Sequence, residues 1–150
     1  MNTAGKFDPV EILIVEDNPH DAELSIRALR KQNLANQIYL ALDGEEALDF
    51  LLSRGKFSHR ILLTPPKVVF LDLKLPKISG LEVLKEIKTN PLTKMIPVVV
   101  ITSSKVDPDI RAASELGANS YVVKPVDFDN FFLSMAQTGF YWLVVNETLR

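Results

Sequence analysis

The chain contains no cysteine, and this absence excludes disulfide bonds, cysteine-bound zinc and thiol catalysis. No apolar stretch approaches the length that spans a membrane, and residues 1–8 lack the basic-then-apolar pattern of a secretory signal. No run of lysine or arginine occurs, and the net charge is only −2. We therefore expect a cytoplasmic protein whose partners include neither nucleic acid nor a membrane surface.

What remains is the composition of an ordinary globular domain. The 150 residues are 47% hydrophobic and 24% charged, which suits one buried core and excludes a disordered chain. No internal repeat, low-complexity tract or linker divides the sequence. We expect one domain over residues 1–150, with a flexible lead over 1–9 and a C-terminal extension over 139–150.

Four short apolar runs each end in a chemically reactive residue. The runs are rich in β-branched residues and bounded by turn formers, which predicts strands that are buried on both faces. They are Val10–Val15 before Glu16 and Asp17, Val68–Leu71 before Asp72, Val98–Ile101 before Thr102, and Tyr121–Val123 before Lys124. A fifth, more polar strand is expected at Ile38–Ala41.

Helix-length segments separate these strands. Cap and breaker residues place helices from about Asn18 to Gln32, Gly44 to Arg54, Gly80 to Asn90, Pro108 to Gly117, and from about Asp127 onward. The connection Gly55–Pro66 is long for such a fold, and long loops are often functional or mobile. The alternation of strands and helices predicts five βα units around a parallel sheet.

Ligands of open parallel sheets bind beyond the carboxyl ends of the strands. That edge would collect carboxylates, which repel one another unless a hard divalent cation such as Mg²⁺ binds them. Asp72 stands alone after its strand and can act as a nucleophile towards phosphorus. Lys124 offers a positive charge and Thr102 a hydrogen bond to the phosphoryl oxygens. These side chains together predict phosphorylation of an aspartate.

The ordered set of motifs resembles the receiver domain of two-component response regulators over roughly residues 9–130. Glu16-Asp17 resembles the acidic pair of that family, and Asp72, with Pro76 and Gly80 after it, resembles its phosphoacceptor. Lys124-Pro125 resembles its lysine-proline pair.

Two further residues resemble the switch of the family. Thr102 matches the switch hydroxyl, and Tyr121 matches the aromatic residue whose rotamer reports phosphorylation. The resemblance implies a flavodoxin-like (βα)5 doubly wound sheet in the strand order 2-1-3-4-5, and a signalling domain that assists its own phosphorylation and dephosphorylation without being an enzyme.

The resemblance also implies a metal site for Mg²⁺ or Mn²⁺. Its ligands would be the carboxylates of Asp17 and Asp72 and the backbone carbonyl of Lys74, with Glu16 contributing through a water molecule. The phosphoryl donor would be a histidine kinase.

A narrower resemblance concerns the long loop before the third strand and the segment Gly139–Leu143. Both resemble the single-domain regulators that partner cyanobacterial phytochrome kinases, which are stand-alone receivers and often dimeric. We therefore expect a phytochrome-type kinase as a partner. No effector domain follows the last expected helix, so output is expected through protein–protein contacts.

Other functions share parts of this pattern. A phosphatase of the haloacid dehalogenase type would place a second aspartate two residues after the nucleophile, where this chain has Lys74. A flavin binder would need a phosphate loop rich in Ser, Thr and Gly, whereas Glu16–Pro19 would repel phosphate. No P-loop occurs, and His20 and His59 are expected at the surface. A degenerate receiver that serves only as an interaction module would not need the full set of site residues.

The last helix has two apolar faces at about 100° per residue. One face collects Phe128, Phe132, Met135, Gly139, Trp142 and Leu143, and the opposite face collects Phe140, Tyr141 and Val144. Six of the twelve aromatic residues lie between Phe128 and Trp142, which is too many for one buried stripe. Either the helix bends at Gly139, or a partner covers the second face; the latter predicts a homodimer through Phe140, Tyr141 and Val144.

Overall fold

A computed structural model of the chain describes residues 12–31, 37–60, 65–103, 108–124 and 128–142. Five parallel strands form one sheet in the order β2-β1-β3-β4-β5. The strands are β1 Ile12–Val15, β2 Ile38–Ala41, β3 Val68–Asp72, β4 Val98–Thr102 and β5 Ser120–Val123. The predicted flavodoxin-like sheet and its strand order are confirmed.

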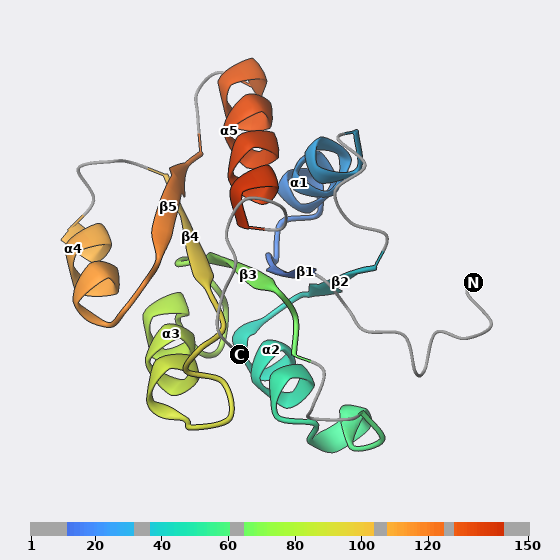
Figure 1. Ribbon diagram of the computed structural model, residues 1–150, viewed down its shortest axis with the longest axis vertical. Helices are drawn as coiled ribbons and strands as arrows, with labels where there is room; N and C mark the ends of the chain where they lie inside the picture. The colour runs from blue at the N-terminus through green and yellow to red at the C-terminus, as the bar shows by residue number, and fades with distance from the viewer. Residues whose placement is uncertain (1–11, 32–36, 61–64, 104–107, 125–127, 143–150) are drawn as a thin grey trace.

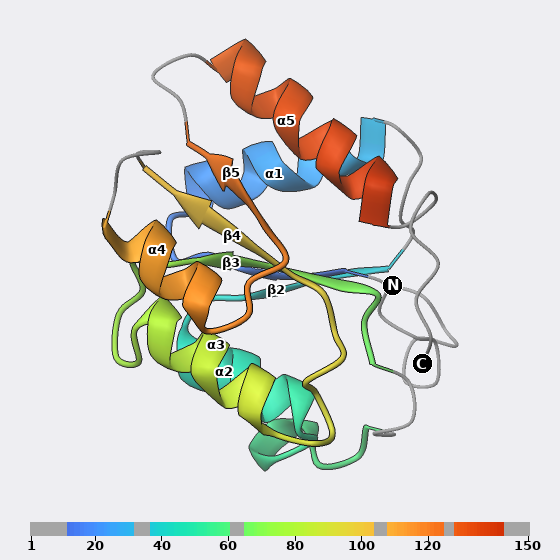
Figure 2. The same ribbon diagram turned by 60° about the vertical axis from the view of Figure 1, so that its left-hand side comes forward.

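The helices cover both faces of this sheet, so the fold is doubly wound and has three layers. They are α1 Pro19–Lys31, α2 Gly44–Leu51, the short 3₁₀ helix η1 Gly55–Phe57, α3 Gly80–Thr89, α4 Pro108–Glu115 and α5 Phe128–Phe140. Helices α1 and α5 lie side by side on one face, and α2, α3 and α4 lie on the other (Figure 1, Figure 2). None of the described helices is long and apolar enough to cross a membrane.

The three central strands β1, β3 and β4 are buried at every residue, which explains why they are continuous apolar runs. Alternate side chains point to opposite faces. Leu13 and Val15 join the core beneath α2 and α3, whereas Ile12 and Ile14 join the core beneath α1 and α5. The sheet thus lies between two apolar layers, and polar residues stand at the carboxyl ends of β3 and β4, which are Asp72 and Thr102.

Helix α2 ends at Leu51, three residues before the predicted end at Arg54. The chain leaves the helical conformation because Ser53 takes a left-handed φ of 53° and Gly55 a φ of 55°. The first part of the long connection then folds back as η1. There Phe57 packs edge-on against Phe50 at a ring distance of 5.3 Å.

Lys88, on α3, connects three elements at the end of the sheet opposite the reactive residues. Its Nζ donates to the carbonyl of Ile96 at 2.7 Å, to that of Lys94 at 3.3 Å, and to Asn119 Oδ1 at 3.0 Å. Asn119 in turn exchanges two hydrogen bonds of 2.8 Å with the backbone of Val98. Burial lowers the pKa of the Lys88 ammonium. The start of β5 is therefore fastened to both β4 and α3.

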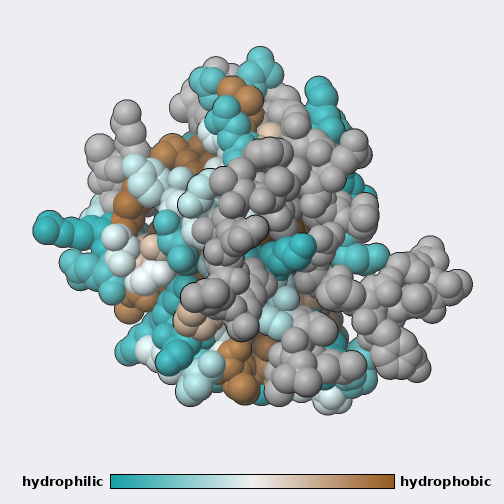
Figure 3. Space-filling model, viewed as in Figure 1, coloured by the Kyte–Doolittle hydropathy of each residue, from teal (hydrophilic) through white to brown (hydrophobic). Residues whose placement is uncertain are grey.

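The described residues on the face shown in Figure 3 are mostly hydrophilic, and their apolar atoms form small separate groups. The exposed large apolar side chains among the described residues are Leu42, Leu92, Met95, Tyr121, Leu133 and Tyr141. The predicted flexible lead over 1–9 lies outside the described residues, as does the part of the C-terminal extension after Trp142.

Candidate functional site

The strand register brings the predicted residues to one edge of the sheet. Val15 pairs with Leu71, so Glu16 follows β1 beside Asp72, the last residue of β3. Asp72 pairs with Ile101, and Thr102 pairs with Val123 at the ends of β4 and β5. The Lys124 N–H donates to the Thr102 carbonyl at 2.6 Å, which fixes the lysine at the same edge.

Glu16, Asp17 and Asp72 form a cluster of acidic side chains. One carboxylate oxygen of each lies within 4.8 Å of the others. Glu16 and Asp72 are buried and Asp17 is exposed, so the cluster opens to solvent on one side. Glu16 Oε1 is buried and lies 2.9 Å from Lys124 Nζ, in an ion pair that does not have hydrogen-bond geometry. Hard, closely spaced oxygens with an open side suit Mg²⁺ or Mn²⁺, which take carboxylates together with water.

The backbone after β3 holds the Asp72 carboxylate in place. The Lys74 N–H donates to Asp72 Oδ1 at 3.0 Å, while Asp72 Oδ2 accepts from Lys124. The Lys74 backbone is therefore next to the carboxylate, where its carbonyl was predicted to bind the metal. That ligand role stays a prediction.

The Lys124 ammonium contacts three carboxylates. Its Nζ lies 2.8 Å from Asp72 Oδ2, 2.9 Å from Glu16 Oε1 and 3.0 Å from Asp21 Oδ2. Burial lowers the pKa of Lys124, but the contacts with these carboxylates, that with Asp72 first, outweigh burial and raise the pKa above its ordinary value. Lys124 is therefore charged at every physiological pH.

Glu16 titrates differently from an ordinary glutamate. Burial, followed by the neighbouring Asp72 carboxyl, raises the pKa of Glu16 to about 8, although the Lys124 ammonium opposes this shift. Four carboxylates, those of Glu16, Asp17, Asp21 and Asp72, surround the single Lys124 ammonium, so the site is short of positive charge. A divalent cation in the cluster would supply that charge and favour the ionised form of Glu16.

Asp21 is a member of the site that the sequence reasoning missed. It lies in the first turn of α1, where an acidic residue commonly only stabilises the helix end. The signal that could have found it is its place in the turn that directly follows Glu16-Asp17, because this turn lies at the same edge of the sheet.

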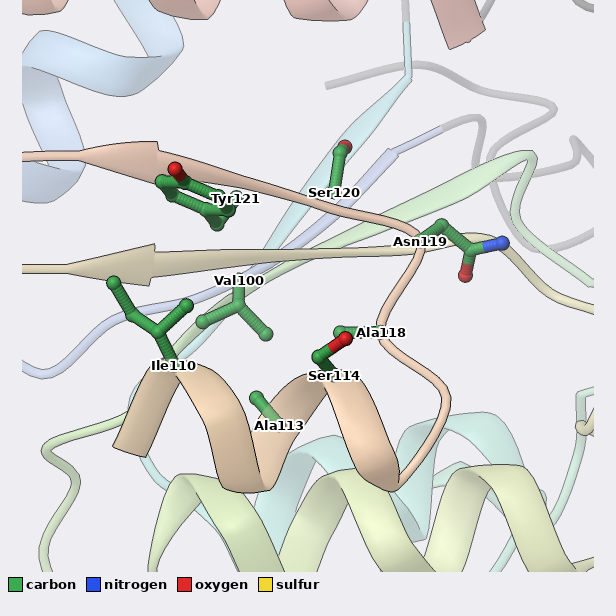
Figure 4. Close-up of a pocket in the computed structure, with 8 residues that line it drawn as sticks. All are labelled: Val100, Ile110, Ala113, Ser114, Ala118, Asn119, Ser120 and Tyr121. Carbon is green, nitrogen blue, oxygen red and sulfur yellow. The ribbon is translucent and has the colours of Figure 1, made fainter. Parts of the chain in front are cut away.

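The two predicted switch residues lie on neighbouring strands. Thr102 is 2% exposed at the end of β4, and Tyr121 on β5 is 51% exposed. Tyr121 lines a cavity of about 380 Å³ between α4 and β5. Figure 4 shows Tyr121 and Ile110 at one end of this cavity and Asn119 at the other, with Ala113 and Val100 between them. Small side chains on α4 leave room there for a larger group.

Only part of the predicted dimer surface is described. Tyr141 is 47% exposed, and its ring packs edge-on against Trp142 at 5.0 Å. Trp142 packs against the core beneath α5 and donates its indole N–H to Ser120 Oγ at 3.2 Å, as expected for the sheet-facing side. The Phe140 side chain and Val144 lie outside the described residues. His20 and His59 are exposed.

The family model of the response regulator receiver domain matches residues 12–135, and the chain therefore belongs to that family. Probable methanogenesis regulatory protein FilR2 of Methanothrix harundinacea is 41% identical over 142 residues, which cover 94% of this chain and 88% of FilR2. Response regulator Rcp1 of Synechocystis sp. is 36% identical over 135 residues, which cover 90% of each chain.

Solved structures agree with these sequence matches. The Mn²⁺-bound form of Rcp1 matches with a TM-score of 0.85 and 34% identity, and the match covers 95% of this chain and 100% of the Rcp1 chain. The phosphorylated cyanobacterial phytochrome response regulator RcpA has a TM-score of 0.84 and 33% identity, covering 93% of this chain and 98% of that chain.

These matches confirm the predicted resemblance to receiver domains and, among them, to phytochrome response regulators. The chain is a receiver-domain response regulator of the Rcp1 and RcpA type, which makes it a signalling domain. Its acidic cluster is consistent with the divalent metal site of a receiver domain, and the predicted Mg²⁺ or Mn²⁺ cofactor is confirmed.

Proposed function

We propose that this chain is a stand-alone response regulator that accepts a phosphoryl group on Asp72 from a histidine kinase. The main support for the proposal is the contact of a buried aspartate with a charged lysine beside a cluster of carboxylates that suits a divalent cation. Asp72 Oδ2 lies 2.8 Å from Lys124 Nζ, and Asp72 shares the cluster with Glu16 and Asp17.

In the transfer step an oxygen of the ionised Asp72 carboxylate attacks phosphorus. The bond between phosphorus and the leaving atom of the donor breaks, and the leaving atom keeps the electron pair. For a phosphohistidine donor this atom is an imidazole nitrogen, and for acetyl phosphate it is an acetate oxygen. When bound, the divalent cation supplies charge that offsets the phosphoryl oxygens.

The remaining residues orient and bind the new group. The Lys124 ammonium already donates a hydrogen bond to Asp72 and would form an ion pair with an oxygen of the phosphoryl group. The Thr102 hydroxyl, at the end of the next strand, would donate to another oxygen and shift towards it. Tyr121 would then turn from its exposed position towards the cavity beside α4. Phosphorylation would thus shift the equilibrium between two conformations of this surface, both of which are already populated before phosphorylation.

The input that we propose is a phytochrome-type kinase. The support is that RcpA is described as a cyanobacterial phytochrome response regulator and that Rcp1 matches over 90% of both chains. A second candidate is a kinase that senses something other than light, because FilR2, described as a probable methanogenesis regulatory protein, is 41% identical. A phosphotransfer screen across the histidine kinases of the host separates these two inputs.

We further propose that output passes through protein–protein contacts, including a homodimer at the end of α5. The support for a stand-alone regulator is that the chain covers 90% of Rcp1 and 98% of RcpA. The support for the dimer is the Tyr141 ring, which is 47% exposed although it packs edge-on against Trp142. A cytoplasmic location stays a prediction.

Intact-mass spectrometry after incubation with acetyl phosphate and Mg²⁺ tests the core of the proposal. We expect one phosphoryl adduct on the wild type and on Asp49→Asn, whose carboxylate contacts Arg54 on a different part of the molecule. We expect no adduct on Asp72→Asn. An equal adduct on Asp72→Asn would assign the phosphoryl group to another residue and overturn the proposal.

A further inference from the structure

Asp21 differs from the other two carboxylates that contact Lys124. Glu16 and Asp72 belong to the acidic cluster that suits a divalent cation, and Asp21 does not. A cation bound there would share the charges of Glu16 and Asp72 and would weaken their attraction for Lys124. The contact of 3.0 Å between Asp21 Oδ2 and Lys124 Nζ would keep its strength when the metal binds.

The local structure leaves the Asp21 side chain free for this contact. Asn18 caps helix α1, since its Oδ1 accepts from the Asp21 N–H at 3.0 Å. An acidic residue at this third helical position often accepts in return from the cap N–H. Here that N–H donates to Glu16 Oε2 at 3.2 Å instead. Asp21 therefore points away from its own helix end and towards the lysine.

The three contacts also fix the direction of the ammonium. The ammonium donates hydrogen bonds to Asp21 Oδ2 and Asp72 Oδ2 and forms an ion pair with Glu16 Oε1. With one N–H directed to Asp21, another N–H points at Asp72, where the phosphoryl group would arrive. Loss of Asp21 would allow the ammonium to rotate away from that direction.

We propose that Asp21 is a positioning residue that holds the Lys124 ammonium at Asp72 for phosphoryl transfer. This inference rests on the proposed function. Asp21 does not touch the phosphoryl group and acts only through Lys124. Because the Asp21 side chain is 31% exposed, its contribution is limited by solvent screening. We expect Asp21→Asn, which keeps the shape and removes the charge, to slow phosphorylation by about three- to tenfold.

Two measurements test this role on the full chain. The first is the rate of phosphorylation by acetyl phosphate with saturating Mg²⁺. The second is the ¹⁵Nζ chemical shift of the Lys124 ammonium. This chemical shift would not change if the substitution affected only the stability of helix α1. Asp21→Asn should lower the rate and change this chemical shift. The control is Glu23→Gln, which removes the same charge from the same helix but contacts Arg27 at 2.6 Å, and it should change neither.

The outcomes separate the inference from the proposed function. A wild type that acquires no phosphoryl group would overturn both. A wild type that is phosphorylated, together with an Asp21→Asn variant of unchanged rate or unchanged Lys124 resonance, would overturn the positioning role alone. Equal slowing by Glu23→Gln would also overturn it, because the effect would then come from net charge. Circular dichroism of each variant checks that the fold is kept.

Discussion

Gly80 lies where helix α3 meets the backbone of Asp72, the proposed phosphoacceptor, and replacing it by alanine should disturb the site without changing its side chains. A Cβ at Gly80 would lie 2.4 Å from the Asp72 carbonyl oxygen, 2.4 Å from Leu73 Cα and 2.8 Å from the Leu73 carbonyl oxygen. All three are backbone atoms of a buried strand end, so they cannot rotate away. The Gly80 N–H also donates to the Leu73 carbonyl at 3.0 Å.

The size of the effect follows from these distances. Ordinary contact would require α3 and the strand end to separate by about 1 Å. Overpacking of this kind costs about 1–3 kcal/mol. Alanine regains about 0.5–1 kcal/mol of backbone entropy over glycine. We expect Gly80→Ala to lower the free energy of unfolding by about 1–2 kcal/mol and, because it shifts Asp72, to slow phosphorylation by about 10- to 100-fold.

Urea unfolding and phosphorylation by acetyl phosphate measure the two effects. Thr89→Ala is the matched control, since it introduces the same side chain at the exposed far end of α3. It should keep the wild-type phosphorylation rate. A Gly80→Ala variant as stable and as quickly phosphorylated as the wild type would show that α3 does not press on the end of β3, and would refute the reasoning.

Four further predictions concern other parts of the chain. Asp17→Asn removes the charge of an exposed carboxylate in the acidic cluster and should weaken Mg²⁺ binding about tenfold or more by titration calorimetry; unchanged affinity would exclude Asp17 as a ligand. Asp43 caps helix α2 by accepting from the Glu46 N–H, and this hydrogen bond lowers the pKa of Asp43. The cap therefore stabilises the fold above the unfolded pKa of about 3.9, and this stability is lost as the pH falls through the lower folded pKa. Asp43→Ala should lower the free energy of unfolding by about 1 kcal/mol at pH 7 and by less below pH 4. Beryllofluoride should alter hydrogen exchange around Tyr121, and identical exchange would contradict the switch. Replacing Phe140 and Tyr141 by serine should convert a dimer to a monomer by light scattering, and a wild type that is already monomeric would contradict the dimer.

The strands could be predicted because each is short, apolar and buried on both faces. Ile12–Val15 and Val68–Asp72 appear in the structure almost where the apolar runs placed them, and the parallel arrangement then brings Glu16, Asp72 and Lys124 together. The end of α2 could not be predicted, because nothing in its composition shows that Ser53 takes a left-handed conformation.

Contacts between side chains far apart in the sequence could not be predicted from the sequence. Asp21 and Lys124 are 103 residues apart, and an acidic residue in a first helical turn already has a local explanation. Lys88 and Asn119 are 31 residues apart, and neither belongs to a motif. Both pairs depend on how the helices sit on the sheet, which local pattern does not determine.

The fastening of Asn119 by Lys88 has a mechanical consequence for signalling. One end of β5 is bonded to Val98 and Lys88, whereas the other end carries the lysine that faces Asp72. We expect a displacement that begins at Lys124 to decrease along the strand towards Asn119. The wall of the cavity would move most beside Tyr121 and Ile110 and least beside Asn119. Phosphorylation would thus change the width of this cavity more at the end near Tyr121 than at the end near Asn119. A partner that distinguishes the phosphorylated from the unphosphorylated protein would need to contact the end near Tyr121.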